Sequence, residues 1–306
     1  MGRLFVTLQY LLPHHLLCRL VYVLTRSRRP WLKDLLIGRF VQHFQPAMSD
    51  ALEPDPLRYD SFNAFFTRAL RAGARSFDAD AGQILCPCDG TVSHCGAFDA
   101  SLRLAAKGHR YSLESLLGGD RQWARRLAGG SFATLYLAPY NYHRVHMPLA
   151  GRLVAAWHVP GRIFSVNAIT AARVPGLFAR NERVICAFEG EFGTFIVVLV
   201  GALFVASMST IWHGEVTPWH GTSRPSGTPG VHALALPDSP GISTFLSRGA
   251  EFGRFNMGST VILLLPAGIS RWDTGACKPG TPCRVGGPLG RIAGVGHAAA
   301  PDARGS

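Results

Sequence analysis

The feature that most constrains the fold is a change of hydrophobic pattern along the 306-residue chain. Residues 4–48 repeat apolar side chains at helical spacing, whereas from residue 84 onward the apolar runs are short and are separated by Gly and Pro. Strands are predicted at Ser131–Leu137, Gly151–Val159, Arg183–Phe188, Thr194–Phe204 and Thr260–Leu265. The pattern therefore predicts an α+β protein in which N-terminal amphipathic helices lead into a β-rich body of antiparallel, barrel-like sheets.

The N-terminal segment, residues 1–48, is both apolar and basic. Leucines recur every four residues from Leu8 onward, and Pro13 is expected to divide the helix into two pieces. A second apolar helical face runs from Trp31 to Phe44. The segment has seven basic residues and one acidic residue, so it carries +6 of the chain's net charge of +12. This charge predicts an anionic partner, either nucleic acid or an acidic membrane surface.

Two interpretations of this segment remain open. It forms either interfacial helices that lie in the plane of a membrane surface, or a helical hairpin packed on the protein's own core with solvated arginines. No stretch reaches the roughly 18–20 uninterrupted apolar residues of a membrane span, and no signal peptide is evident. We therefore expect a chain that is soluble or lies on a membrane. Its 47% apolar and 16% charged residues exclude general disorder.

The rest of the chain is expected to form one continuous domain. Residues 49–80 predict a connector with a helix in SFNAFFTRAL, whose phenylalanines would pack in the core or line a lipid entrance. Residues 214–242 are rich in Gly, Pro, Ser and Thr and predict a long exposed loop, and a strand pair is expected near residues 282–292. The domain is predicted to comprise 49–266 together with 267–306.

Three short stretches carry side chains capable of chemistry. Asp89 lies in CPCDGTV, where a structural turn is the plainer interpretation. His143 and His146 lie in YHRVHMP, where a metal pair, a general base and a structural role are all open. Gly258 and Ser259 lead into the last predicted strand; glycine permits close approach to its carbonyl, and the serine could attack it if a base took its proton. Together the stretches supply Asp, His and Ser, the set that activates a hydroxyl.

The sequence as a whole resembles the bacterial phosphatidylserine decarboxylases, the membrane-associated type that processes itself and depends on a pyruvoyl group. The resemblance covers nearly the whole chain and is carried by LQYLLP, FNAFFTRALR, YHRVHMP, FSVNAITAARVPGLFARNERVICAFEG, IWHGEVTP and EFGRFNMGSTVI. The YHRVHMP and GRFNMGSTVI contexts are jointly specific. The chain departs from the common family pattern at Asn141, Cys86, Cys88 and Met257, and none of these changes removes a group that the chemistry needs.

The resemblance implies a self-cleavage reaction. Asp89 would support His146, and His146 would take the proton from Ser259, so that the three residues form the charge relay of self-processing. The Ser259 hydroxyl would attack the Gly258 carbonyl, and elimination would then break the chain between these two residues. Ser259 would finally become the pyruvoyl group.

The resemblance also implies the enzymatic reaction. A β chain of residues 1–258 and an α chain of residues 259–306 would stay together as a heterodimer, with room for a higher oligomer. The pyruvoyl group from Ser259 would form a Schiff base with phosphatidylserine, carbon dioxide would leave, and His143 would supply the proton that completes phosphatidylethanolamine. No metal or external cofactor is implied, and seven cysteines without a CxxC pair favour free thiols.

The resemblance favours a membrane over nucleic acid as the anionic partner. The enzyme would lie peripherally on the cytoplasmic face of the inner membrane, held by its basic N-terminal segment near the phosphatidylserine that it uses. Two other function classes remain open. One is a lipid-binding module whose catalytic set has been lost, and the other is a metal- or serine-dependent hydrolase that uses Asp89, His143, His146 and Ser259. Of the three, the decarboxylase alone predicts self-cleavage.

Overall fold

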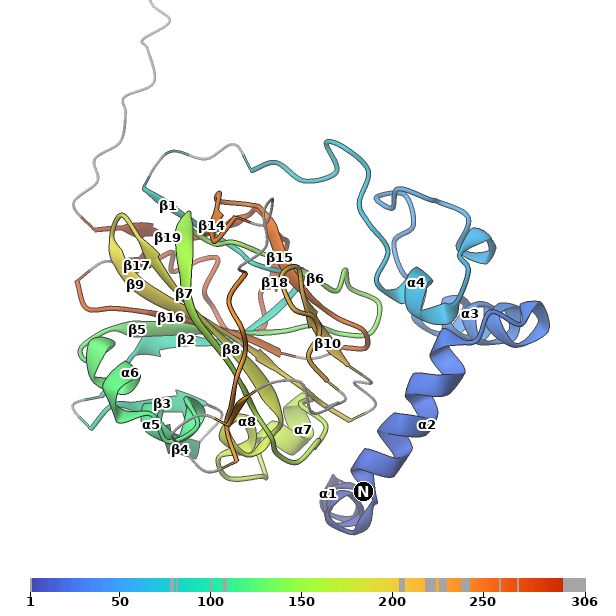
Figure 1. Cartoon of the computed structure of the whole chain (residues 1–306), viewed down its shortest axis with the longest axis horizontal. Helices are drawn as coiled ribbons and strands as arrows, with labels where there is room; N and C mark the ends of the chain where they lie inside the picture. The colour runs from blue at the N-terminus through green and yellow to red at the C-terminus, as the bar shows by residue number, and fades with distance from the viewer. Residues whose placement is uncertain are drawn as a thin grey trace, which may run out of the picture.

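Three N-terminal helices lie beside a larger β-rich body (Figure 1). The structure is a computed structural model, and it describes residues 2–77, 80, 82–99, 101–106, 109–203, 207–217, 224–225, 230–237, 243–258, 260–268 and 270–293. The helices are α1 (Gly2–Leu11), α2 (His14–Arg26), α3 (Pro30–Phe44), α4 (Phe62–Phe66), α5 (Leu113–Leu116), α6 (Arg121–Arg126), α7 (Ala168–Ala171) and α8 (Leu177–Arg180), with a 3-10 turn η1 (Pro56–Arg58). The strands are β1 (Gln83–Leu85), β2 (Gly90–Ala97), β3 (Arg103–Ala106), β4 (His109–Ser112), β5 (Ser131–Tyr136), β6 (Arg144–His146), β7 (Gly151–Val159), β8 (Arg183–Gly190), β9 (Gly193–Val200), β10 (Met208–Thr210), β11 (Gly214–Glu215), β12 (Arg224–Pro225), β13 (His232–Ala233), β14 (Phe245–Leu246), β15 (Glu251–Phe255), β16 (Thr260–Leu265), β17 (Ser270–Trp272), β18 (Pro282–Cys283) and β19 (Pro288–Ile292).

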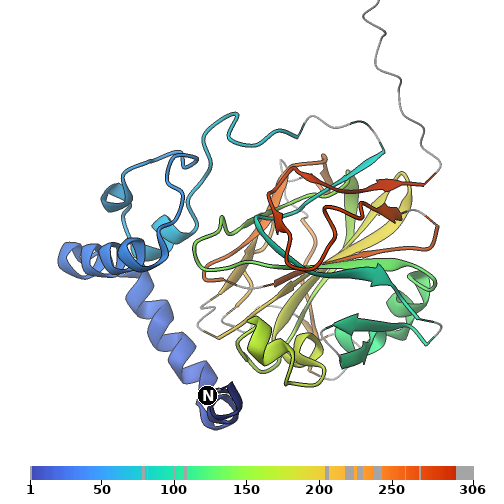
Figure 2. The same ribbon diagram turned by 180° about the vertical axis from the view of Figure 1, so that it is seen from behind.

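Prolines set the boundaries of the N-terminal helices, which Figure 2 shows from behind. Pro13 separates α1 from α2 and confirms the predicted break, because proline lacks the amide hydrogen that a helix interior needs. Pro30 begins α3, where that hydrogen would have no helical partner. Ile37 and Phe40 of α3 pack against the phenylalanines of α4. Within the described ranges, none of the helices is long and apolar enough to cross a membrane.

The body is organised around one large antiparallel sheet. Its described strands follow the order β12-β13-β7-β8-β9-β16-β5-β2-β18, with β14 paired to β7, and the order does not close into a barrel. Strand β16 lies inside this sheet between β9 and β5, and all six of its residues are buried. The α+β class with a β-rich antiparallel body is therefore confirmed, in the form of open sheets.

A four-stranded sheet brings two of the sequence motifs together. Its order is β11-β10-β15-β6, so that β15 lies between β10 and β6. His146 in β6 lies opposite Glu251 in β15, and Arg144 lies opposite Arg254. The histidine motif and the strand that leads toward Gly258 are thus direct neighbours.

Some predicted elements have different limits in the structure. The strand expected to reach Phe204 ends at Val200, because its partner β8 begins at Arg183, directly opposite Val200. Phe204 itself lies outside the described residues. The helix predicted in SFNAFFTRAL is present but shorter than expected, and α4 ends at Phe66.

Two predictions about the C-terminal half are wrong. Residues 214–242, predicted as a loop, contain the short strands β11, β12 and β13 in their described part. These strands join other parts of the chain, since β11 pairs with β10 and β13 pairs with β7. Near residues 282–292 the strands β18 and β19 do not pair with each other. The chain turns at Gly286, whose φ of +82° suits glycine, and β18 joins β2 while β19 lies between β1 and β17.

Candidate active site

The segment between β15 and β16 connects the four-stranded sheet to the large sheet. β15 ends at Phe255, and β16 begins at Thr260 as a buried strand inside the large sheet. Ser259 lies outside the described residues, so the site is built from its neighbours. Because both flanking strands are fixed in sheets, Gly258 is confined to the short connection between them.

His143 faces Gly258 from inside the protein. Its side chain is fully buried, and its Nδ1 donates a hydrogen bond to the Asn141 carbonyl at 2.8 Å. Its buried Nε2 has no partner among the described residues, and a Cβ added to Gly258 would lie 3.1 Å from this nitrogen. Burial, with the nearby charge of Arg68, lowers the pKa of His143 to about 3, so the ring is neutral. An unpaired basic nitrogen therefore lies against the expected cleavage point.

His146 is held by hydrogen bonds at both ring nitrogens. Nδ1 donates to the Gly249 carbonyl at 2.8 Å, and Nε2 accepts from the Tyr142 hydroxyl at 2.9 Å. The ring also stacks on Phe77, with centroids 5.5 Å apart. Burial lowers the pKa of His146 and raises that of Tyr142, so the imidazole is neutral and the hydroxyl remains a donor. His146 must release Tyr142 before its Nε2 can take another proton.

Asp89 lies nearby and is bonded to other groups. Arg75 donates to both of its carboxylate oxygens, at 2.6 and 3.3 Å, and the Val285 amide donates to one of them at 2.8 Å. In the part of the chain that the structure describes, Asp89 makes no hydrogen bond with His146. Burial has the largest effect on the pKa of His146 and lowers it; the hydrogen bond to Gly249 and the Glu251 charge raise it, and the Asp89 charge raises it by less than either. The two residues are thus in electrostatic range, without the direct contact of a charge relay.

An apolar cavity of about 340 Å³ opens beside Gly258. The N-terminal helices contribute Val21 and Phe40 to its wall, and Met257 lies next to Gly258 in the lining. Phe66 of α4 is fully buried and also lines this cavity. The lining suits a hydrocarbon ligand with its reacting end at Gly258.

Comparison with known proteins points to one family. A family model described as phosphatidylserine decarboxylase matches residues 62–291, and a second model, described as PSD, matches residues 4–45. Three relatives named phosphatidylserine decarboxylase proenzyme come from Stutzerimonas stutzeri (48% identical, 95% of each chain covered), Bordetella petrii (49% identical, 93% of this chain and 96% of the relative) and Bordetella pertussis (51% identical, 88% of each chain). The chain belongs to the phosphatidylserine decarboxylase family.

Membership in the phosphatidylserine decarboxylase family confirms the resemblance that the motifs carry. The family is one of carboxy-lyases, and its model covers both the histidine motif and the segment around Gly258. Among the described residues, no group of three or more His, Cys, Asp or Glu side chains is arranged to hold a metal ion. All seven cysteines are among the described residues, and none of them forms a disulfide bond.

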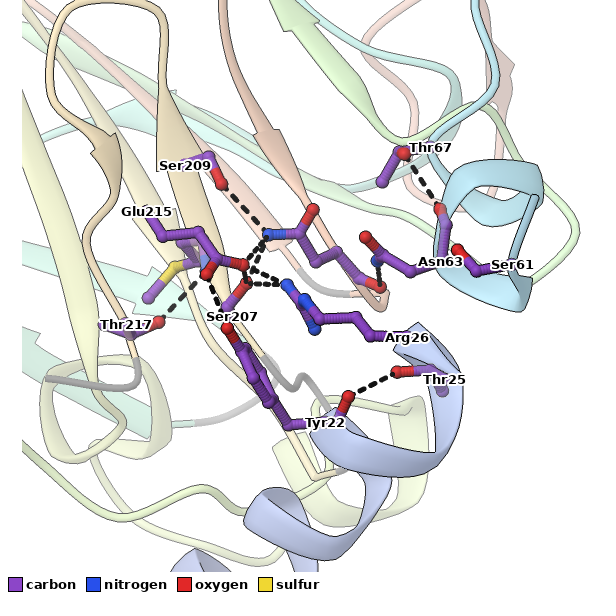
Figure 3. A network of polar contacts seen from close by, with 12 residues as sticks. Tyr22, Thr25, Arg26, Ser61, Asn63, Thr67, Ser207, Ser209, Glu215 and Thr217 are labelled. Atoms are coloured by element: carbon purple, nitrogen blue, oxygen red, sulfur yellow. Dashed lines mark hydrogen bonds and ion pairs between the residues drawn. The ribbon is translucent and has the colours of Figure 1, made fainter. Parts of the chain in front are cut away.

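Sequence reasoning missed several residues at this decarboxylase-family site. Tyr142 binds His146, and Arg75 binds Asp89. A polar network around Asn256 holds the segment before Gly258, and its partners Ser207, Ser209 and Glu215 are labelled in Figure 3. Tyr142 and Asn256 lie inside the family motifs YHRVHMP and EFGRFNMGSTVI, which is the signal that could have singled them out. Tyr142 binds His146 within the same motif, whereas the side-chain partners of Asn256 lie more than 40 residues away and leave no local pattern.

Proposed function

We propose that this chain is a phosphatidylserine decarboxylase proenzyme that cleaves itself between Gly258 and Ser259 and then converts phosphatidylserine to phosphatidylethanolamine. The observation that carries the proposal is the unpaired Nε2 of buried His143, which lies against Gly258 at the wall of an apolar cavity. A neutral base, a glycine followed by serine and a cavity for hydrocarbon are the parts that the two reactions require.

In self-cleavage, His146 takes the proton of the Ser259 hydroxyl, and the oxygen attacks the Gly258 carbonyl. Asp89 and the nearer Glu251 would both stabilise the imidazolium that forms, since the charges of both raise the pKa of His146, Glu251 more than Asp89. For this step the Nε2 of His146 exchanges its bond with Tyr142 for one with Ser259. The amide becomes an ester, and elimination removes the α-hydrogen of residue 259 and breaks its Cβ–O bond, so that the oxygen stays on the Gly258 carboxylate. The new N-terminal dehydroalanine tautomerises to an imine, and water hydrolyses this imine, which releases ammonia and leaves the pyruvoyl group.

In decarboxylation, the pyruvoyl group at position 259 supplies the electron sink. Nδ1 of His143 is bonded to the Asn141 carbonyl, so Nε2 is the ring nitrogen that would deliver a proton to the α-carbon after carbon dioxide has left. The negative carboxylate and phosphate of bound phosphatidylserine would raise the pKa of His143 from its value in the free protein, so that Nε2 can take up this proton. The apolar walls of the cavity keep water away from this proton transfer. Phe66, whose ring centroid lies 4.1 Å from that of His143, holds the imidazole in place.

The proposed cleavage leaves two chains that remain packed together. The α chain, residues 259–306, keeps β16 between β9 and β5 of the β chain, residues 1–258. The Val285 amide of the α chain also donates to Asp89 of the β chain. The body therefore works as one catalytic domain built from 49–266 and 267–306.

The N-terminal helices have one face on the protein and one face outside. α2 buries His14, Cys18 and Thr25. Large apolar side chains on the other face are exposed: Leu8, Leu11, Leu16, Leu20, Val23, Leu24, Trp31 and Leu35. The buried face is consistent with packing on the protein's own body, and the exposed apolar face supports the proposal that the segment lies on a membrane. We place the exposed face on the cytoplasmic surface of the inner membrane, where its basic residues meet anionic lipid.

Binding to lipid vesicles is expected to depend on lipid charge and on salt. The bound fraction in flotation should rise with anionic lipid, because residues 1–48 carry a net charge of +6. It should fall as added salt shortens the Debye length from about 10 Å to about 3 Å. Replacing the exposed Leu20 and Val23 with Ser should lower the bound fraction further, because these changes remove apolar surface that the membrane would bury. Binding that ignores lipid charge, salt and these substitutions would contradict the membrane assignment.

Mass spectrometry and denaturing electrophoresis of the purified protein test the proposed function. We expect two chains of 258 and 48 residues, the shorter with an N-terminal pyruvoyl group that hydroxylamine modifies. Release of carbon dioxide from phosphatidylserine should accompany them. An intact, hydroxylamine-insensitive chain of 306 residues would show that the proposal is wrong.

A further inference from the structure

Asn256, just before the expected cleavage point, is almost fully buried and held on all sides, with 3% of its surface exposed. Its backbone N–H donates to the Ser207 carbonyl at 2.9 Å, and its carbonyl accepts from Asn63 at 3.0 Å. Its side-chain Nδ2 donates to the hydroxyls of Ser207 and Ser209 and, at 3.4 Å, to Glu215. The main chain before the cleavage point is thus fixed by backbone and side-chain contacts together (Figure 3).

Glu215, in β11, is the centre of this network. Its Oε1 accepts hydrogen bonds from Arg26, Ser207 and Asn256. Its Oε2 accepts from the Tyr22 hydroxyl at 2.7 Å. The Arg26 guanidinium also donates to Ser207 at 3.0 Å and lies 3.7 Å from the centroid of the Tyr22 ring. Four donors therefore converge on one carboxylate, and two of them come from helix α2.

The ion pair at the centre is only partly shielded from water. The side chains of Arg26 and Glu215 are 23% and 30% exposed, and water competes for ion pairs that are partly hydrated. The same contacts nevertheless fix the direction of the carboxylate and of the Ser207 hydroxyl, both of which bind the side chain of Asn256. Loss of the ion pair should thus affect geometry more than stability.

We propose that Glu215 and Arg26 are positioning residues for self-cleavage. They hold the Asn256 side chain, and through it they hold the Gly258 carbonyl where the Ser259 hydroxyl attacks. Neither residue has a hydrogen bond to Gly258 in the part of the chain that the structure describes, and the inference rests on the proposed self-cleavage. Helix α2 therefore helps to form the cleavage site on one face while it presents apolar side chains on the other.

The test compares Glu215→Gln with Asp80→Asn in the full chain, made by cell-free synthesis and sampled over time on denaturing gels. Both changes turn a carboxylate into an amide, and Asp80, which pairs with Arg291 at 2.7 Å, has a similar exposure of 33%. In Glu215→Gln, an NH2 group replaces one carboxylate oxygen. Because this group is itself a donor, it cannot accept the hydrogen bonds that converge on Glu215, and it displaces the groups that donate them. Cleavage should slow by about 10- to 100-fold, which is the loss of rate expected when reacting groups are misplaced by about 1 Å. Asp80→Asn should cleave at the wild-type rate.

A second pair of variants separates positioning from a purely structural role. Arg26→Ala should slow cleavage, whereas Arg26→Lys keeps a positive charge beside Glu215 and should recover much of the rate. The melting temperatures of these two variants should be nearly equal, because the ion pair is partly exposed. Equal slowing in both variants, in step with equal losses of melting temperature, would assign the pair a structural role only.

The outcomes distinguish this inference from the proposed function. If the wild-type chain is cleaved and Glu215→Gln is cleaved equally fast, or is slowed no more than Asp80→Asn, the positioning role alone is wrong. If the wild-type chain stays intact, the proposed self-cleavage is wrong and the positioning role fails with it.

Discussion

Replacing Ser259 with Ala is expected to leave the chain at its full length of 306 residues and to abolish decarboxylation. Without the hydroxyl, nothing attacks the Gly258 carbonyl, and no pyruvoyl group forms at position 259. Activity should fall by more than about 10⁴-fold, the scale seen when a covalent nucleophile is removed. Intact mass and carbon dioxide release measure the two effects on the same preparation.

Exposed Ser247 provides the matched control for this change. Ser247→Ala also replaces a serine with alanine, at a position outside the proposed site, and this variant should be cleaved and active like the wild type. Cleavage at Gly258 that persists in Ser259→Ala would mean that another group breaks the chain. The self-processing mechanism would then be wrong, whatever the activity of the product.

Replacing His143 with Ala is expected to permit cleavage and to reduce decarboxylation by about 10²- to 10⁴-fold, the range of a lost general acid–base catalyst. The Nε2 of His143 is the unpaired nitrogen beside Gly258, so its loss removes the proton carrier at the reacting end of the cavity. His146→Ala and Asp89→Ala should instead block cleavage. Chain length and turnover of the three variants, measured side by side, separate the two reactions.

The pH dependence provides a second check on His143. Burial lowers its pKa to about 3, so its Nε2 is unprotonated at every pH above that value. Deprotonation of His143 near pH 6.5, the ordinary value for histidine, should therefore not appear in the pH profile of kcat/KM, which reports the pKa values of the free enzyme. His94→Ala, on β2, changes a histidine without a role in the proposal and should keep full activity. Full turnover in His143→Ala would exclude the proposed proton transfer.

The elements that follow from local pattern are those that sequence predicts well. Gly151–Val159 is a strand with the predicted limits, and Pro13 divides the N-terminal helix as predicted, because each outcome depends on neighbouring residues. The pairing of β18 with β2 and of β19 with β1 and β17 depends on distant strands and on the turn at Gly286. Such pairings leave no mark in the periodicity of a single segment.

The candidate site divides in the same way. Motif resemblance selects His143 and Gly258, and the structure brings these two residues together. The motif resemblance does not reveal that Asp89 binds Arg75, because that contact depends on the path of the connector after α4. Nor does it reveal that Glu215 binds Arg26, since these residues are separated by 189 positions and meet only after the helices pack on the body.

The position of β16 inside the large sheet affects how the mature enzyme unfolds and refolds. The uncut chain folds in a unimolecular reaction, with β16 inserted between β9 and β5 while it is still tethered to them. After the proposed cut, the same insertion requires two separate polypeptides to meet, and its rate depends on concentration. Heat or denaturant would thus release the α chain, which would not reassociate with the β chain in dilute solution. The stability of the mature enzyme would therefore depend on a slow rate of unfolding rather than on a reversible folding equilibrium.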